Sequence, residues 1–203
     1  MKQETPKPDI HRLIELQAFL LHFRNIDRVI RVPKDATHVR ENDVEHSYTL
    51  AMAAWFLAQY FPELDKDCVI RFALAHDLVE MYAGDTYIFA DKTLLDTKKQ
   101  REEKAARRIG VEWPDFQEMN ESITAYEAKD SPEALFVYAL DKIMPILVNV
   151  LTEGHTWKLE SITLKQLHDN KLDKVSVSPE IRPYYDQLYE LLRENIHWFN
   201  AAR

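Results

Sequence analysis

The chain has 203 residues, of which 46% are hydrophobic, and it carries a formal net charge of −8. This apolar content is enough for one sizeable core and excludes a disordered chain. The negative charge argues against binding to nucleic acid polymers or anionic membranes. Only three glycines occur, and because tight turns use glycine repeatedly, a turn-rich β-sandwich or barrel is excluded. We therefore expect an all-α protein.

The first residues and the cysteine content indicate where the protein acts. Cys68 is the only cysteine, which rules out an internal disulfide and is typical of a reducing compartment. The start, MKQETPKPD, lacks the apolar segment of a signal peptide. No apolar run approaches the roughly 18 residues of a membrane span. We expect a cytoplasmic protein with a flexible tail at residues 1–8 and one domain at residues 9–203.

The N-terminal half contains two segments with helical spacing of apolar residues. The first helix is predicted over residues 9–22. Residues 24–43 mix a proline, charges and β-branched side chains, and we interpret them as a long loop. A second helix is predicted over residues 44–60, before Pro62. Its apolar side chains are expected to face the core; they are Val44, Tyr48, Ala51, Met52, Trp55 and Leu57.

A third predicted helix, over residues 67–83, is apolar on most faces and is therefore expected to be central. Gly84 is placed to cap its C-terminus. A charged helix with a solvated face follows over residues 95–109 and is expected to end at Gly110.

The C-terminal half continues the helical pattern. Another helix is predicted over residues 113–128. Ser131 and Ser178 are each followed by proline and glutamate, the order of an N-cap, a first-turn proline and a first-turn acid. The helices that they open are expected to reach Leu151 and Phe199. The whole pattern predicts six to eight helices and no strand.

Two His-Asp dipeptides occur, and their surroundings differ. His168-Asp169 lies in the polar stretch QLHDNKLDK and is interpreted as a surface pair. His76-Asp77 ends the apolar run CVIRFALAHD, where an uncompensated charge is costly. These two side chains must therefore form ion pairs or bind a metal, and a structural ion-pair network is the alternative to a metal site.

Further residues of metal-ligand type accompany His76-Asp77. Glu80 follows His76 by four residues and is expected on the same helical face, and Asp85 comes just after Gly84. His46 opens the second helix, and Asp141 lies inside the apolar segment LFVYALDKIMPIL. Two imidazoles and two carboxylates suit a divalent cation such as Mn²⁺, Co²⁺, Fe²⁺, Ni²⁺ or Zn²⁺ and leave positions for water and substrate.

The pattern of His46, His76-Asp77 and Asp141 resembles the HD-domain superfamily of metal-dependent phosphohydrolases. The segments NDVEHSYTLAMAAWFLA, IRFALAHDLVEMYAGD and SPEALFVYALDKI resemble the branch that includes bacterial 5′-deoxynucleotidases. The resemblance covers residues 13–151, and residues 152–203 are generically helical. It implies one globular helical HD domain in which His46, His76, Asp77 and Asp141 hold one divalent metal ion.

The resemblance also implies roles for other side chains. Glu80 and Asp85 are the expected catalytic residues, which orient the attacking water and assist proton transfer. Arg31 is expected to contact the substrate phosphate and Lys142 to balance its charge. The arginines that lie close enough to blur this choice are Arg24, Arg28 and Arg40. A structural role stays open for each: support of a ligand for Glu80, a turn cap for Asp85, and an ordinary surface charge or ion pair for the basic residues.

We therefore expect an enzyme, a phosphohydrolase acting on a small phosphate ester, with (deoxy)nucleoside 5′-monophosphates as the leading substrates. One alternative is a non-catalytic regulatory HD protein that binds nucleotides. Another is a hydrolase of a different phosphoester, such as a nucleoside triphosphate or a cyclic nucleotide. Two-metal members of the superfamily place extra histidines between the His-Asp pair and the last aspartate, whereas residues 78–140 contain no histidine.

The aromatic residues near the C-terminus fall at helical spacing and are expected to pack in the core or at a dimer face. They are Tyr184, Tyr185, Tyr189, Trp198 and Phe199. Together with the dimeric habit of the resembled family, they lead us to expect a homodimer.

Overall fold

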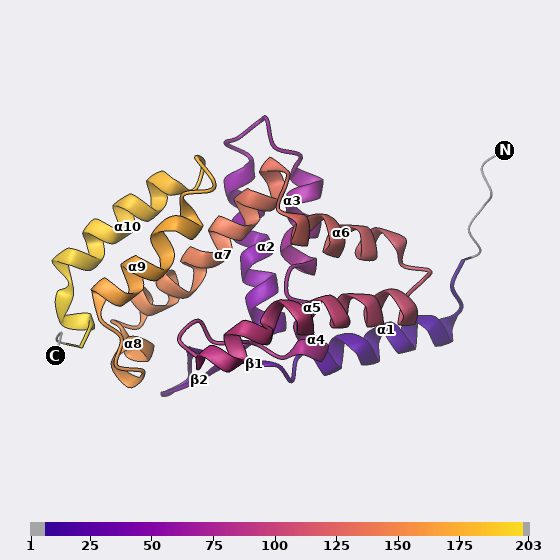
Figure 1. Ribbon diagram of the computed structural model, residues 1–203, viewed down its shortest axis with the longest axis horizontal. Helices are drawn as coiled ribbons and strands as arrows, with labels where there is room; N and C mark the ends of the chain where they lie inside the picture. The colour runs from indigo at the N-terminus through magenta and orange to yellow at the C-terminus, as the bar shows by residue number, and fades with distance from the viewer. Residues whose placement is uncertain (1–6, 201–203) are drawn as a thin grey trace.

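A computed structural model describes residues 7–200 and is dominated by α-helix (Figure 1). The all-α prediction is therefore confirmed, and most of the predicted tail at residues 1–8 lies outside the described residues. The elements are α1 (Ile10–Phe23), β1 (Asp27–Lys34), β2 (Thr37–Asn42), α2 (Asp43–Ala58), α3 (Lys66–Ala75), α4 (Glu80–Ala83), α5 (Lys92–Glu112), α6 (Gln117–Ala128), α7 (Pro132–Leu151), α8 (His155–Leu159), α9 (Leu164–Val175), α10 (Arg182–Glu194) and a 3₁₀ turn (Ile196–Trp198).

Two hydrophobic clusters hold these helices together. One cluster lies among α2, α3 and α7 and continues to α9 and α10, and the other joins α1, α5 and α6 to the end of α3. Figure 1 shows α2 and α7 in the middle, with α9 and α10 on one side and α1, α5 and α6 on the other. The region where α2, α3 and α7 meet is thus enclosed by both halves of the domain.

Helix α7 is central to this arrangement. Among the described residues it is the one helix with the length and apolar composition of a membrane span, and half of its most apolar window is buried in the fold. It packs against α2, α3 and α9, and its middle carries the charged pair Asp141-Lys142. We therefore assign it as the core helix of the domain. Its start matches the predicted cap, because Ser131 Oγ accepts from the backbone N–H of Ala134 and Pro132 is the first helical residue.

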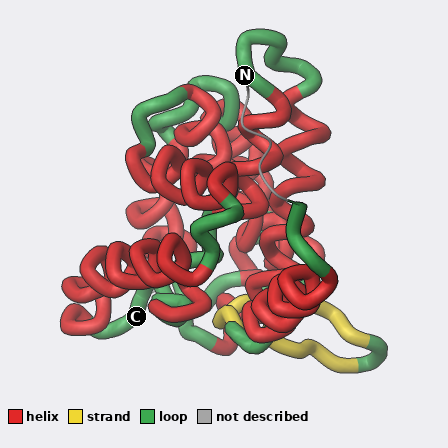
Figure 2. Tube along the Cα trace, turned by 90° about the vertical axis from the view of Figure 1, so that its right-hand side faces the viewer, coloured by secondary structure: helices red, strands yellow, loops and turns green. Residues whose placement is uncertain are grey.

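The interpretation of residues 24–43 as a loop is wrong, because this segment contains the antiparallel hairpin β1–β2. Figure 2 shows the hairpin at one edge of the helical body. Its turn needs no glycine, since Asp35 takes the positive φ of 52°, a conformation that aspartate tolerates better than most residues. The strands contact α2, α7 and α8, so the hairpin lies against two helices, α2 and α7, that carry predicted site residues.

The predicted helix over residues 67–83 is interrupted. Helix α3 ends at Ala75, and the backbone N–H groups of Leu78, Glu80 and Met81 bond to carbonyls three residues earlier. This tight turn precedes the short helix α4, which Gly84 caps with a φ of 75°. Glu80 therefore does not share a continuous α-helical face with His76. Helix α5 also departs from prediction, since it continues through Gly110 to Glu112.

Of the six side chains of α2 that were predicted to face the core, Ala51 is buried and Leu57 packs against the core. The other four, Val44, Tyr48, Met52 and Trp55, form an apolar stripe that does not face the core. These side chains have exposed fractions of 37%, 63%, 44% and 56%. The buried face consists of polar residues and small or medium apolar residues: Asp43, His46, Ser47, Leu50, Ala51, Ala54 and Ala58. Apolar side chains do recur at helical spacing along α2, but on the face that points away from α3. The face that packs against α3 carries smaller side chains and site residues.

Candidate active site

The four predicted metal ligands converge where α2, α3 and α7 meet. An Asn42–Glu45 capping box fixes the start of α2, which places His46 in the first turn. Ligand atoms of His46, His76 and Asp77 lie within 4.8 Å of one another. Asp141 joins them from α7, since its Oδ1 lies 2.9 Å from His46 Nε2 and 4.0 Å from His76 Nε2.

The hydrogen bonding of His76 leaves one ring nitrogen free to bind a cation. Its Nδ1 lies 2.9 Å from the carbonyl oxygen of Ala73, and because a carbonyl oxygen accepts only, Nδ1 carries the proton. The other ring nitrogen, Nε2, is buried without a hydrogen-bond partner, and Asp77 Oδ2 lies 2.9 Å from it. A nitrogen lone pair and a carboxylate oxygen that face the same space fit a divalent cation.

Asp141 is held as an anion. Its Oδ1 bonds to His46 Nε2, and its Oδ2 accepts from Lys142 Nζ at 2.5 Å. Burial works against the charged form, but Lys142 and His46 outweigh it and lower the pKa of Asp141. The same ion pairing raises the pKa of His46 to about 9 against the opposing effects of burial and Arg28.

Negative charge is in excess around this cluster. Burial, followed by the charge of Asp77, raises the pKa of Asp43 to about 7 and also raises the pKa of Glu80. Arg28 supplies positive charge, with Nη1 2.7 Å from Asp77 Oδ2 and 3.2 Å from Asp43 Oδ1. Oδ2 of Asp43 and Oε2 of Glu80 nevertheless remain buried without partners. This surplus of carboxylate oxygens is the setting in which a bound cation is favourable.

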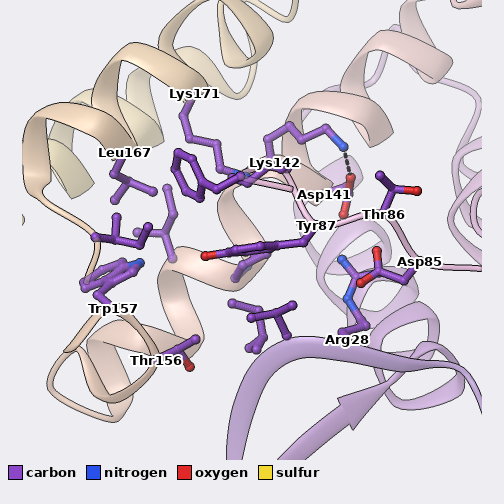
Figure 3. Close-up of a pocket in the computed structure, with 17 residues that line it drawn as sticks. Arg28, Asp85, Thr86, Tyr87, Asp141, Lys142, Thr156, Trp157, Leu167 and Lys171 are labelled. Carbon is purple, nitrogen blue, oxygen red and sulfur yellow. Dashed lines mark hydrogen bonds and ion pairs between the residues drawn. The ribbon is translucent and has the colours of Figure 1, made fainter. Parts of the chain in front are cut away.

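A pocket adjoins the cluster, between β1, the segment 85–89 and helices α7, α8 and α9 (Figure 3). Its polar side includes Arg28, Asp85, Asp141 and Lys142, and its apolar side includes Ile146, Trp157, Ile162 and Leu167. Figure 3 shows Asp141 and Arg28 on one side of the pocket and Trp157 and Leu167 on the other. This division suits a ligand with an anionic group at one end and a flat or apolar group at the other.

Comparison with known proteins identifies the domain. A family model described as HD domain matches residues 24–182. The chain belongs to the HD-domain family. It is 35% identical over 185 residues to the 5′-deoxynucleotidase HDDC2 of Bos taurus, covering 87% of each chain. It is 32% identical over 138 residues to HDDC2 of Homo sapiens, covering 64% of this chain and 66% of that protein.

A solved structure supports the same family. The crystal structure of a predicted metal-dependent phosphohydrolase from Magnetospirillum magnetotacticum MS-1 superposes with a TM-score of 0.76 at 32% identity. The match covers 94% of this chain and 96% of that chain. The resemblance to the HD superfamily that the sequence motifs indicated is therefore confirmed.

The two predicted catalytic carboxylates lie at different places in this HD domain. Oxygen atoms of Glu80, Asp43 and Asp77 lie within 4.8 Å of one another, and Glu80 Oε1 accepts from Lys98 Nζ at 3.2 Å. Asp85 lines the pocket directly, whereas Glu80 does not. Burial is the main cause that raises the pKa of Asp85.

The two predicted phosphate-binding residues also separate. Lys142 lines the pocket, but Arg31 does not; the Arg31 backbone N–H donates to Thr156 Oγ1 at 3.0 Å. Arg28, which the sequence left as a neighbouring candidate, lines the pocket and contacts Asp77. The register of the hairpin shifts between Asp27 and Arg31, so regular alternation along a strand could not have told which of these arginines lines the pocket.

Sequence reasoning missed Glu41, Asp43 and Lys171. Glu41 and Asp43 are both buried and paired with Arg28. Lys171 is buried on α9 and lines the pocket, outside the segment that carried the family resemblance. A signal existed for Lys171, because it stands four residues from both Leu167 and Val175, in the buried stripe of its helix.

Proposed function

We propose that this protein is a metal-dependent phosphomonoesterase that hydrolyses (deoxy)nucleoside 5′-monophosphates. The observation that carries the proposal is the buried cluster of His46, His76, Asp77 and Asp141 beside a pocket with a charged side and an apolar side. Membership of the HD family and similarity to proteins named 5′-deoxynucleotidase support the reaction and the substrate class. The apolar side offers space for the nucleoside, and the charged side for the phosphate.

His46, His76, Asp77 and Asp141 would hold a divalent cation, which would supply Lewis acidity toward a phosphoryl oxygen and would activate a water. Lys142 and Arg28 balance the charge of the phosphate, and the guanidinium of Arg28 has donors beyond those used by Asp77 and Asp43. Asp85, with its raised pKa, is placed to exchange a proton as water adds to phosphorus and the 5′ ester oxygen leaves.

The direct test is phosphate release by the purified protein after chelation and reloading with Mn²⁺, Co²⁺ or Zn²⁺. Nucleoside and deoxynucleoside monophosphates should release phosphate, while nucleoside triphosphates and cyclic nucleotides should not. Turnover of a cyclic nucleotide or a triphosphate alone would assign a different phosphoester. Nucleotide binding without hydrolysis under any of these metals would favour the regulatory alternative.

We further propose one cation per chain, of the borderline type that mixed imidazole and carboxylate ligands prefer: Mn²⁺, Co²⁺, Fe²⁺, Ni²⁺ or Zn²⁺. A second group of carboxylates, Asp43, Asp77 and Glu80, could in principle hold another cation. Arg28 supports a count of one, because it already contacts Asp43 and Asp77. Elemental analysis of the purified protein should give one equivalent, and two tightly held equivalents would contradict the proposal.

Arg28 rather than Arg31 should bind the phosphate. Arg28→Met should lower kcat/KM by roughly 10²-fold, because a buried, charge-assisted contact is lost, whereas Arg31→Met should stay within about 3-fold. Steady-state kinetics of both variants tests this, with metal content measured in parallel because Arg28 also contacts Asp77. A larger loss for the Arg31 variant would reverse the assignment.

We propose a homodimer whose interface includes the apolar stripe of α2. Of the C-terminal aromatics, Tyr185 and Phe199 are 1% and 7% exposed and belong to the core of the monomer, whereas Tyr184 is 38% exposed. A two-fold interface would cover the same stripe on both copies.

Light scattering should give twice the 24.0 kDa of one chain. Trp55→Glu should give a single chain, while Leu151→Glu, at a residue that is 82% exposed on α7, should stay dimeric. A monomeric parent protein would refute the dimer.

We also propose that the enzyme acts in the cytoplasm on a free small molecule and not on a nucleic acid polymer. The single cysteine, Cys68, supports the first point. The net charge of −8 supports the second. Cell fractionation and a filter-binding assay with DNA and RNA test them separately. Retention of either polymer at physiological salt would contradict the second point.

A further inference from the structure

Lys171 is a buried lysine without a salt-bridge partner in the part of the chain that the structure describes. Its exposed fraction is 4%, and within residues 7–200 it forms no salt bridge. Lys142, which also lines the pocket, pairs with Asp141, and Lys98 on α5 pairs with Glu80 and Glu102. A buried ammonium that lacks an anion costs free energy, so a residue of this kind indicates a ligand that supplies the missing charge.

Lys171 stands on the buried face of α9, at a place where its side chain lines the pocket. Residues four before and four after it, Leu167 and Val175, are buried apolar members of the same stripe of α9. The stripe would be continuous if a leucine replaced the lysine. Lys171 lines the pocket together with Lys142 and Leu167, and Figure 3 shows its side chain extending from α9 toward α7.

The electrostatics of the pocket wall leave Lys171 uncompensated. Burial, and then the positive charge of Lys142, lowers the pKa of Lys171 to about 7, and Asp141 opposes this effect. Asp141 already contacts His46 Nε2 and Lys142 Nζ. A bound cation would offset more of its negative charge. The wall formed by α7 and α9 therefore carries two lysine amines, of which Lys142 is paired with Asp141 and Lys171 has no salt-bridge partner among the described residues.

We propose that Lys171 is a substrate-binding residue that donates a hydrogen bond to an anionic oxygen of the substrate phosphate. This inference rests on the proposed phosphomonoesterase function. A phosphate monoester is a dianion near neutral pH and offsets both Lys171 and Lys142, whereas a nucleobase offers neutral acceptors that leave the excess charge in place. Lys142 from α7, Arg28 from β1 and Lys171 from α9 then surround the phosphate from three elements.

The test measures, by calorimetry, the affinity of the purified Mn²⁺-loaded protein for the two parts of a product mixture, inorganic phosphate and deoxyadenosine. Lys171→Met should weaken phosphate binding by about 10- to 100-fold, while deoxyadenosine binding should change by less than about 2-fold. Lys171→Arg should keep most of the phosphate affinity. Lys165→Met is the matched control, because Lys165 is exposed on the same helix and paired with Asp169; it should leave both affinities unchanged.

Thermal unfolding without ligand separates binding from support of the fold. Removal of an unpaired buried charge should leave the Tm of Lys171→Met equal to or above that of the parent. Three results would overturn the inference: unchanged phosphate affinity, loss of deoxyadenosine affinity alone, or a lowered Tm in both the Met and Arg variants. If nucleoside monophosphates are hydrolysed but the affinity for phosphate is the same with and without Lys171, only this inference fails. If phosphate binding requires Lys171 but no monophosphate is hydrolysed, the proposed function fails and the anion site remains.

Discussion

Replacing Asp77 with alanine should remove stoichiometric metal and lower turnover by roughly 10³-fold or more, since a catalytic cation contributes several kcal/mol to the transition state. The carboxylate is shared within the cluster: its Oδ2 lies 2.9 Å from His76 Nε2 and 3.9 Å from His46 Nε2. Elemental analysis and phosphate release on the same preparation measure both effects.

The chain contains its own control for this experiment. Asp169 belongs to the second His-Asp dipeptide, lies on the surface of α9 and pairs with Lys165 at 2.5 Å. Asp169→Ala should keep the metal and the parent rate. Circular dichroism of Asp77→Ala is needed beside it, because the substitution also removes the 2.7 Å contact with Arg28. A folded Asp77→Ala protein that retains one equivalent of metal would show that Asp77 is not a ligand.

The same two dipeptides show why the candidate site could be predicted from the sequence. His76-Asp77 interrupts an apolar run, and polar groups in such a run need partners, so the sequence itself indicated a cluster. His46 and Asp141 met the same condition in two other apolar helices, and the structure brings all four together. His168 and Asp169 lie in a polar stretch and form no such cluster; His168 instead bonds to the hydroxyl of Tyr185.

The elements that were missed depend on local geometry without a strong sequence signal. The hairpin turns at Asp35 rather than at a glycine, and the break after α3 uses i to i−3 hydrogen bonds without proline or glycine. The outward face of α2 could not be told from the inward one, because both faces repeat at the helical period. Burial by α3 decides between them, and burial depends on the tertiary structure. Arg28 was obscured for the same reason, since its position at the pocket depends on the missed strand.

The break after α3 bears directly on Glu80, the residue that most clearly separates chemistry from metal binding. Helical spacing from His76 predicts that Glu80 lies on the same helical face, but no continuous helix joins the two residues. The tight turn achieves proximity by another route, because it brings Glu80 within 4.8 Å of oxygens of both Asp43 and Asp77. Its side chain is 4% exposed, with Oε1 on Lys98 and Oε2 unpartnered.

Glu80→Gln should therefore keep the fold, the metal and KM within a few-fold, and should lower kcat by roughly 10²-fold through loss of positioned acid–base help. Glutamine preserves the size of the side chain, and Lys98 retains its 2.5 Å ion pair with Glu102, so the surroundings should persist. Glu102→Gln is the matched control, because Glu102 pairs with the same lysine, Lys98. This variant should hydrolyse substrate at nearly the parent rate. Loss of metal from Glu80→Gln to the extent seen in Asp77→Ala would make Glu80 a ligand. An unchanged kcat would make it structural, and since burial also raises the pKa of Asp85 at the pocket wall, proton transfer would then fall to Asp85.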